Sequence, residues 1–212
     1  AGAVTLAGIN SFSGGTTISA GSLIGSSRSF GTGAIVNNAS LVIDEATDTS
    51  FGLVISGTGS LTKIGAGAVT LTGANSFTGG TTISAGSLIG NSQNFGTGPI
   101  INNTSLVFDQ ATAGSFGGAI SGTGSLTKTG AGALTLTGVS SFSGGTTISS
   151  GSLIASSQSL GTGPIVNNTS LVLNQSTAGT LGGAISGAGT LTKTGAGAVT
   201  LTGVNTFTGG TT

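Results

Sequence analysis

Short runs of alternating apolar and polar residues, each about four residues long, recur along the whole chain. In the run AVTLTG, Val69 and Leu71 alternate with Thr70 and Thr72. A period of two is typical of a β-strand, and the β-branched Thr, Val and Ile favour the pleated backbone. Gly, Asn or Ser ends each run, and no apolar stripe has the 3.6-residue spacing of a helix. The pattern therefore predicts an all-β fold made of short strands.

A long internal repeat, without gaps, organises these runs. Residues 65–90 and 130–155 are identical at 20 of 26 positions, and the numbering advances by 65 from each copy to the next. Three full repeats and a partial fourth fill the chain, at 1–65, 66–130, 131–195 and 196–212. We therefore expect one continuous array over residues 1–212, and we expect it to be a window of a longer protein.

Each repeat contains three shorter passages that resemble one another. In the second repeat they hold the apolar pairs Ile83/Leu88, Ile101/Leu106 and Ile120/Leu126. Each pair brackets a turn-forming insert, so we interpret the repeat as about three coils of about 22 residues. A single coil buries too little apolar surface to offset the entropy of ordering it, whereas stacked coils share hydrogen bonds and apolar contacts. The sequence predicts a parallel β-helix (β-solenoid) with about three rungs per repeat and about ten rungs in all.

The composition excludes several kinds of chemistry. The chain has 43 Gly and no Cys, His, Trp, Tyr or Met. A Cys/His metal site and a Ser-His-Asp or Cys-His nucleophile therefore cannot form. Four basic residues cannot neutralise a nucleic-acid backbone, and no apolar run approaches the ~18 residues of a membrane-spanning helix. We expect a protein that is not an enzyme, with no catalytic, cofactor-binding or metal site, no nucleic-acid partner and no insertion of this segment into a membrane.

Acidic residues are the remaining candidates for chemistry, since pectin-cleaving enzymes also use parallel β-helices. Asp44, Glu45 and Asp48 lie close together, and Asp109 is the one acid kept in the equivalent loops of later repeats. Acid–base catalysis needs a matching partner in a cleft, and the calcium-binding nonapeptide GGxGxDxUx does not occur. A solvated, variable loop is the favoured interpretation.

Threonine pairs raise an ice-binding alternative. Three segments resemble the TxT ranks of ice-binding β-solenoids: Thr70-x-Thr72, Thr135-x-Thr137 and Thr200-x-Thr202. The motif comes once per three expected rungs, and Ala7 breaks it in the first repeat. Ordinary outward-facing strand positions are therefore the favoured interpretation of these threonines.

Asn and Phe recur in register with the repeat. The Asn pairs at 37–38, 102–103 and 167–168 are expected to close turns, because Asn tolerates left-handed geometry and bonds its own backbone. The second Asn of each pair also begins an N-glycosylation pattern, which we interpret as coincidence. Four phenylalanines are expected to pack in the core or at the Gly-Gly bend: Phe12, Phe77, Phe142 and Phe207.

Lysine falls once in each full repeat, at Lys63, Lys128 and Lys193. With three rungs in each repeat, a basic line of these residues would be a weak adhesive feature at most. We interpret them as edge-strand charges that discourage lateral pairing.

The passage GAGAVTLTGANSFTGGTTISAGSL resembles the autotransporter-associated β-strand repeat, or passenger-associated repeat, of Gram-negative type V secretion proteins. The matching residues are Gly67 to Leu71, Thr72-Gly73, Asn75, Phe77, Gly79 to Ile83 and Ala85 to Leu88. The match recurs at 1–23, 131–153 and 196–212, although the family often has Tyr where this chain has Phe. The resemblance implies a right-handed parallel β-helix that is exported and displayed at the outer-membrane surface or released.

These features together predict a non-enzymatic stalk or display scaffold, which could present its flank to an unknown surface or host ligand. The alternative is a self-assembling extracellular fibre, in which consecutive chains stack head to tail through unpaired strand edges. An ice-binding β-solenoid is the remote alternative.

Overall fold

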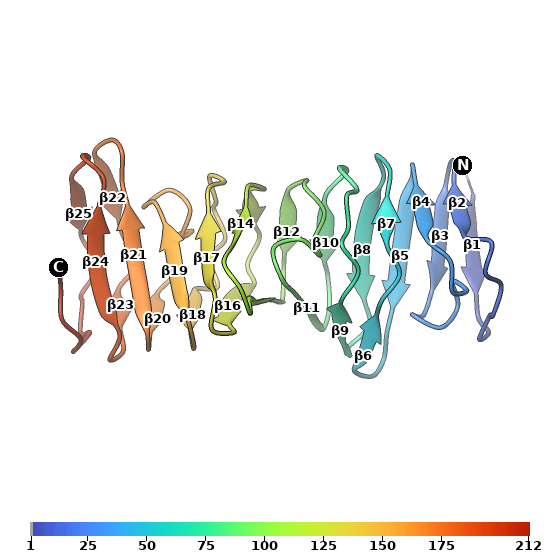
Figure 1. Ribbon diagram of the computed structural model, residues 1–212, viewed down its shortest axis with the longest axis horizontal. Coiled ribbons are helices and arrows are strands. Elements are labelled where there is room, and N and C mark those ends of the chain that lie inside the picture. Colours follow the sequence, from blue (N-terminus) through green and yellow to red (C-terminus); the bar gives the residue numbers. More distant parts are fainter. Residues whose placement is uncertain (1) are drawn as a thin grey trace. The chain divides into compact units, whose positions relative to one another are not determined.

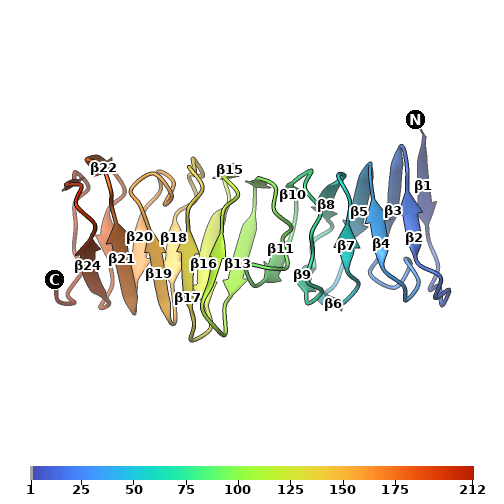
Figure 2. The same ribbon diagram turned by 45° about the horizontal axis from the view of Figure 1, so that its top comes forward.

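The computed structural model describes residues 2–212, and all of its regular elements are β-strands (Figures 1 and 2). The strands pair in parallel and the chain coils from one sheet to the next, so the expected parallel β-solenoid is confirmed. The chain divides into two compact units, one ending at Ser105 and the other running from Leu106 to Thr212.

The first unit contains twelve strands. Their bounds are β1 (Ala3–Leu6), β2 (Thr16–Ile18), β3 (Ser22–Gly25), β4 (Ile35–Asn37), β5 (Ser40–Asp44), β6 (Thr49–Phe51), β7 (Ile55–Ser56), β8 (Ser60–Ile64), β9 (Ala68–Leu71), β10 (Thr81–Ile83), β11 (Ser87–Gly90) and β12 (Ile100–Asn102). They form three parallel sheets in the orders β1-β3-β5-β8-β10-β12, β2-β4-β7 and β6-β9-β11.

The second unit repeats this arrangement, and β13 begins at the last residue of the first unit. The bounds are β13 (Ser105–Asp109), β14 (Gly114–Phe116), β15 (Ile120–Ser121), β16 (Ser125–Thr129), β17 (Ala133–Leu136), β18 (Thr146–Ile148), β19 (Ser152–Ala155), β20 (Ile165–Asn167), β21 (Ser170–Asn174), β22 (Gly179–Leu181), β23 (Ile185–Ser186), β24 (Thr190–Thr194) and β25 (Val199–Leu201). Within the unit the strand orders are β13-β16-β18-β20-β23, β14-β17-β19-β21-β24 and β22-β25.

One turn of the coil is shorter than the expected ~22 residues. Ala3 lies opposite Ser22, Ser22 opposite Ser40, and Ser40 opposite Ser60, so successive turns advance the numbering by 19, 18 and 20. Three turns therefore lead from Ala3 to Ser60. Ala68, which is the equivalent of Ala3 in the second repeat, follows only eight positions later.

Those eight positions carry the chain from β8 to β9, which lies in a different sheet. β1 and β3 belong to the sheet that continues through β5 and β8, whereas their equivalents β9 and β11 belong to the sheet that contains β6. The second unit shows the same step, because β13 and β16 share one sheet and their equivalents β21 and β24 share another. Each repeat thus spans about three and one third turns, and equivalent strands of successive repeats occupy different sheets.

The core consists of apolar side chains at alternate strand positions, stacked from turn to turn. Leu41 lies opposite Leu61 in the first unit, and both are fully buried. In the second unit Leu153 lies opposite Leu171, and both are equally buried. The apolar side chains of the alternating pattern therefore form continuous columns inside the coil.

The repeated phenylalanines confirm core packing in the interior turns. Phe77 and Phe142 have no exposed surface, whereas Phe12 in the first turn is 43% exposed. Phe207 in the last turn is half-buried. Burial at this position therefore depends on having a turn stacked on each side.

The Gly-Gly bend before β10 requires glycine for two reasons. Gly80 has a φ of 87°, a left-handed conformation that side chains with a Cβ rarely adopt. A Cβ on Gly80 would also lie 2.7 Å from the carbonyl oxygen of Pro99 in the next turn. The bend thus depends on glycine for both its curvature and its close stacking.

Candidate functional site

Two of the three repeated lysines are buried inside the coil, so their interpretation as edge-strand charges was wrong. Lys63 in β8 and Lys128 in β16 have no exposed surface. The strand alternation explains this placement, because Lys63 lies two residues after the inward-facing Leu61. That spacing is the signal in the sequence, although a charged side chain ordinarily marks an exposed position. Within the second unit, Lys128 in β16 and Lys193 in β24 also lie in different sheets, so these two lysines do not form a line along one flank.

Lys63 ties two successive turns together. Its Nζ donates to the carbonyl oxygens of Ile64 at 2.7 Å and Gly65 at 2.8 Å, which lie at the corner after its own strand. It also donates to the carbonyl oxygen of Ala85 at 3.3 Å, one turn further on. We call a lysine with these three carbonyl acceptors a lysine latch.

Lys128 forms the same latch in the second unit. Its Nζ donates to the carbonyl oxygens of Thr129, of Gly130 at 2.8 Å and of Ser150 at 3.2 Å. An ammonium group has three protons, so three acceptors satisfy it fully. Each complete latch therefore compensates for burying a charged group through hydrogen bonds to backbone carbonyls that also need partners.

Lys193 forms only part of a latch. Its Nζ donates to the carbonyl oxygens of Thr194 at 2.6 Å and Gly195 at 2.7 Å. The third acceptor of the complete latches comes from the residue 22 positions after the lysine, which for Lys193 lies outside the sequence. The side chain is half-buried in the last turn.

Burial also lowers the pKa of the lysine in each complete latch. Removal from water lowers the pKa of Lys63, and the negative charges of Glu45 and Asp44 oppose that change. Burial lowers the pKa of Lys128 in the same way, opposed by Asp109.

The acidic residues do not converge on one site. Asp44, Asp48 and Asp109 are exposed, and among residues 2–212 no group of three or more acidic, His or Cys side chains could hold a metal ion. Glu45 differs from the expected solvated loop, because it is 7% exposed and accepts a hydrogen bond from the backbone N–H of Ser27 in the preceding turn.

The equivalent residue of the third repeat makes the same contact as Glu45. Gln175 replaces it in the third repeat, and its Oε1 accepts a hydrogen bond from the N–H of Ser157 at 2.8 Å. A neutral amide performs this role as well as a carboxylate, so the position does not require a charge.

The two residues of each asparagine pair differ in burial. Asn37 is buried, its Nδ2 donates to the carbonyl oxygen of Ser60 at 2.8 Å, and its Oδ1 accepts from the N–H of Ala39 at 3.2 Å. The expected bond to the local backbone is therefore confirmed. Every positive φ in the described chain belongs to glycine, so these asparagines do not use left-handed geometry. The second residue of each pair is exposed: Asn38, Asn103 and Asn168.

The TxT threonines lie on outward positions, but they do not form one rank. In the second unit Thr135 lies in β17, which pairs with β14 and β19, whereas Thr200 lies in β25, which pairs with β22. Since the two strands belong to different sheets, no flat threonine lattice connects these two motifs of the second unit.

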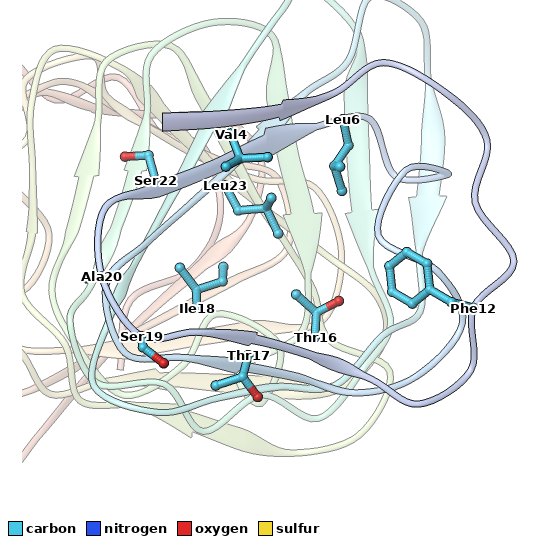
Figure 3. Close-up of a pocket in the computed structure, with 10 residues that line it drawn as sticks. All are labelled: Val4, Leu6, Phe12, Thr16, Thr17, Ile18, Ser19, Ala20, Ser22 and Leu23. Atoms are coloured by element: carbon cyan, nitrogen blue, oxygen red, sulfur yellow. The ribbon is translucent and has the colours of Figure 1, made fainter. Parts of the chain in front are cut away.

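The coil is open at the face of the first turn. A hollow of 280 Å³ enters the apolar interior there, and its lining includes the side chains of Val4, Leu6, Phe12, Ile18 and Leu23 (Figure 3). Figure 3 shows Val4 and Leu23 pointing into the same space as Ile18 from the opposite strand.

A second hollow lies at the face of the last turn. It measures 190 Å³ and is lined by Leu173, Leu191, Lys193, Val199, Leu201 and Thr211. Both hollows are continuations of the core rather than clefts with converging polar groups. The geometry therefore supports stacking of a further turn better than binding of a small polar substrate.

Within residues 2–212 we find no helix with the length and apolarity that crossing a bilayer requires.

Comparison with known proteins matches the chain to a family of repeats. The family model described as passenger-associated-transport-repeat matches residues 1–24, 61–89, 126–155 and 191–212. These segments coincide with the recurring passage identified in the sequence, including its latch lysines Lys63, Lys128 and Lys193. No curated protein and no solved structure is significantly similar to the chain.

Proposed function

Since the chain belongs to the passenger-associated-transport-repeat family, we propose that it is a structural scaffold of an autotransporter passenger, displayed at the surface of a Gram-negative bacterium or released from it. We assign it no catalytic step. Its function in this proposal is mechanical, because each additional repeat lengthens the coil. The coil then holds other parts of a passenger, or its own flank, away from the membrane.

The observation that carries the proposal is the way in which each interior turn is held by both neighbours. β9 pairs with β6 on one side and β11 on the other, and its inward Val69 and Leu71 are buried. Each added turn therefore brings its own backbone hydrogen bonds and its own section of core. Stability then grows by nearest-neighbour contacts, as expected for a repeat protein.

Because each repeat spans about three and one third turns, equivalent residues of successive repeats face different directions on such a scaffold. The outward-facing Thr17 of β2 and its equivalent Thr82 of β10 lie in different sheets of the first unit. A surface feature that recurs in every repeat is consequently presented in successive directions around the coil. An adhesive motif that occurs once in each repeat would therefore be exposed on several sides of the coil, and its copies would not lie together on one flat surface.

Insertion of an additional copy of residues 66–130 tests the scaffold function. About three and one third turns at the usual strand spacing of ~4.8 Å predict a chain longer by roughly 16 Å. Small-angle scattering and electron microscopy would measure the added length, and a scrambled insert of the same composition is the control. An insertion that leaves the maximum dimension unchanged, or that adds a separate globule, would contradict the proposal.

Surface display needs its own test. An epitope placed in the exposed loop at Asp48 of the passenger should be accessible to antibody on intact bacteria, and a periplasmic marker should not. Labelling that requires permeabilised cells would contradict the proposed location.

The second candidate function is a head-to-tail fibre of stacked chains. The formal net charge of zero favours it, because copies of such a chain do not repel one another.

A further inference from the structure

Three neighbouring strands of the second unit end beside a hollow of 240 Å³. β17, β19 and β21 pair in parallel, so their carboxyl ends lie side by side (Figure 1). Three residues at these ends line the hollow: Thr137 follows β17, Ser156 follows β19, and Asn174 is the last residue of β21. β14 pairs with β17 on one side and β24 pairs with β21 on the other, so the hollow belongs to interior turns of the coil.

The lining of this hollow combines hydroxyl groups with apolar side chains. Its most buried residues are Leu136, Ala155 and Ser159, each at most 3% exposed. The Oγ of Ser159 lies 3.0 Å from the Oγ of Ser156, and either hydroxyl can donate in this hydrogen bond. Ile154 adds a half-buried apolar side chain.

None of the side chains that the structure shows around the hollow carries a charge. The third repeat differs in this respect from the other two, because Asn174 stands where they have Asp44 and Asp109. Ser176, which also lines the hollow, stands where both have alanine. The third repeat therefore has an amide and a hydroxyl in place of a carboxylate and a methyl group, and both of these groups can donate and accept hydrogen bonds.

The third repeat also has smaller side chains at this corner than the second. In the second repeat Asn94 is 4% exposed, its Nδ2 donates to the carbonyl oxygen of Gly73 at 2.8 Å, and its Oδ1 accepts from the N–H of Asn91 at 2.6 Å. Ser159 and Ser156 are the equivalents of Asn94 and Asn91. A hydroxyl group thus replaces a larger amide at both positions, and each side chain occupies less of the corner.

Hydrogen bonds hold the loop that follows β19 in place. The N–H of Ser159 donates to the carbonyl oxygen of Ser156 at 3.1 Å, and the N–H of Ser157 donates to the Oε1 of Gln175 at 2.8 Å. Gln175 follows β21 directly and is 3% exposed, so the second bond links two loops that border the hollow. A site whose loops are already held in place loses less entropy when a ligand binds.

We propose that this hollow binds one neutral hexose unit of a glycan. Its hydroxyl and amide groups donate and accept hydrogen bonds, as the hydroxyl groups of a sugar also do. The side chains of Ile154 and Ala155 provide apolar surface for the C–H groups of the ring. A charged ligand would lose its hydration without meeting an opposite charge. The volume is below the ~300 Å³ at which pockets for drug-sized ligands begin, so a single ring is the appropriate size.

This binding function goes beyond the scaffold function, because it depends on the side chains of one repeat and not on the length of the coil. Methyl NMR of the full chain tests it, with Ile and Ala methyl groups labelled and the methyl glycosides of glucose, galactose and mannose as probes. We expect the resonances of Ile154 and Ala155 to shift to saturation with at least one of these sugars, at a Kd of about 1–10 mM.

Ile89 is the matched control within the same protein, since it occupies the equivalent position in the second repeat. Shifts at Ile154 without shifts at Ile89 would support the proposed site. The absence of shifts with all of the probes, or equal shifts at both isoleucines, would overturn it. Neither result changes the expected length of the coil or its labelling on intact cells, so the scaffold function is tested separately.

An exchange of one short segment tests which side chains bind the sugar. Residues 155–159, ASSQS, are replaced by the GNSQN of residues 90–94, which amounts to Ala155→Gly, Ser156→Asn and Ser159→Asn. The second repeat folds with this segment, so circular dichroism and the melting temperature should change little. The Kd measured at Ile154 should rise about tenfold or more, because two amides replace the hydroxyls and occupy the space of the sugar. An undiminished affinity would overturn the proposed site.

Thr137→Val keeps the test independent of folding defects. Thr137 is exposed and follows its strand, and Val has nearly the same shape without the hydroxyl. The Kd should rise about threefold to tenfold, as expected for the loss of one hydrogen bond. An unchanged Kd would show that the sugar does not contact this side of the hollow, and it would overturn the proposed site.

Discussion

The turns that begin at residues 1 and 66 have nearly the same sequence but different surroundings. Residues 1–20 and 66–85 are identical at 17 of 20 positions. Val4 is 58% exposed whereas Val69 is fully buried, and Phe12 is 43% exposed whereas Phe77 is fully buried. The difference arises because the turn of β6 to β8 packs against the later segment. A turn of this repeat thus buries its apolar side chains fully only when neighbouring turns pack on both of its faces. The neighbouring turns therefore determine how much each residue contributes to stability.

The largest expected difference between the two turns is at the phenylalanines. Phe77→Ala should lower the free energy of unfolding by about 3–5 kcal/mol, because it leaves a cavity in a packed interior. Phe12→Ala should cost less than ~1 kcal/mol, because its ring is already partly in solvent. Guanidinium unfolding followed by circular dichroism measures both values. Equal losses would show that the two turns are packed alike in solution.

A smaller difference is expected between complete and partial latches. Lys128→Met removes the donor for three carbonyl oxygens and should cost about 2–4 kcal/mol, as buried acceptors lose a charged partner. Lys193→Met removes two bonds at a half-exposed site and should cost under ~1 kcal/mol. The same denaturation assay applies. A stabilising Lys128→Met would mean that the desolvation of the ammonium outweighs its hydrogen bonds.

Gly14 and Gly79 occupy equivalent positions of two repeats and differ in how much space surrounds a Cβ at that position. Gly79→Ala should destabilise the chain by about 1–3 kcal/mol, because its Cβ would meet the backbone of Gly59. Gly14→Ala should be neutral or slightly stabilising, because it restricts the unfolded chain without a clash. Thermal melts of the two single variants test this difference. A destabilising Gly14→Ala would show that the first turn is covered in solution.

The smallest expected effect is a rise in stability at high pH. Because burial lowers the pKa of Lys63 and Lys128, the unfolded chain binds more protons than the folded chain between the lowered values and the ordinary 10.5. The cost of burying the charge is present in full below that window and is relieved as the pH rises through it. The free energy of unfolding should therefore increase towards pH 10.5.

The control for this effect is a Lys63→Met, Lys128→Met double variant, in which the rise should disappear. The chain lacks His, Cys and Tyr, so few other groups titrate in the same range. A fall in stability over that window would show that the carbonyl acceptors hold these pKa values above the ordinary one.

Much of this fold could be read from the sequence. The alternation of Val69 and Leu71 with threonines predicted short half-buried strands, and the long repeat period predicted parallel stacking. The inward phenylalanines and the absence of helical spacing followed from the same pattern. These features are local, because a period of two fixes which side chains share a face.

The interpretation of the lysines shows where sequence reasoning went wrong. Alternation placed Lys63 on the inward face, beside Leu61, but charge is the usual marker of exposure. The acceptors that permit its burial include Ala85, 22 positions further on, which sequence alone does not place within reach. Glu45 was missed for the same reason, since its partner is the N–H of Ser27 in the preceding turn.

The sequence by itself determined that the chain forms short parallel strands and that turns must stack to bury an apolar interior. Only the tertiary structure decided how much chain makes one turn, and hence that each repeat winds about three and one third times around the coil. The physical reason is that strand alternation depends on residues adjacent in the sequence. The length of a turn depends instead on how tightly its three corners bend and pack against the turns beside them. That length places equivalent residues of successive repeats in different sheets, and it brings Lys63 within reach of Ala85.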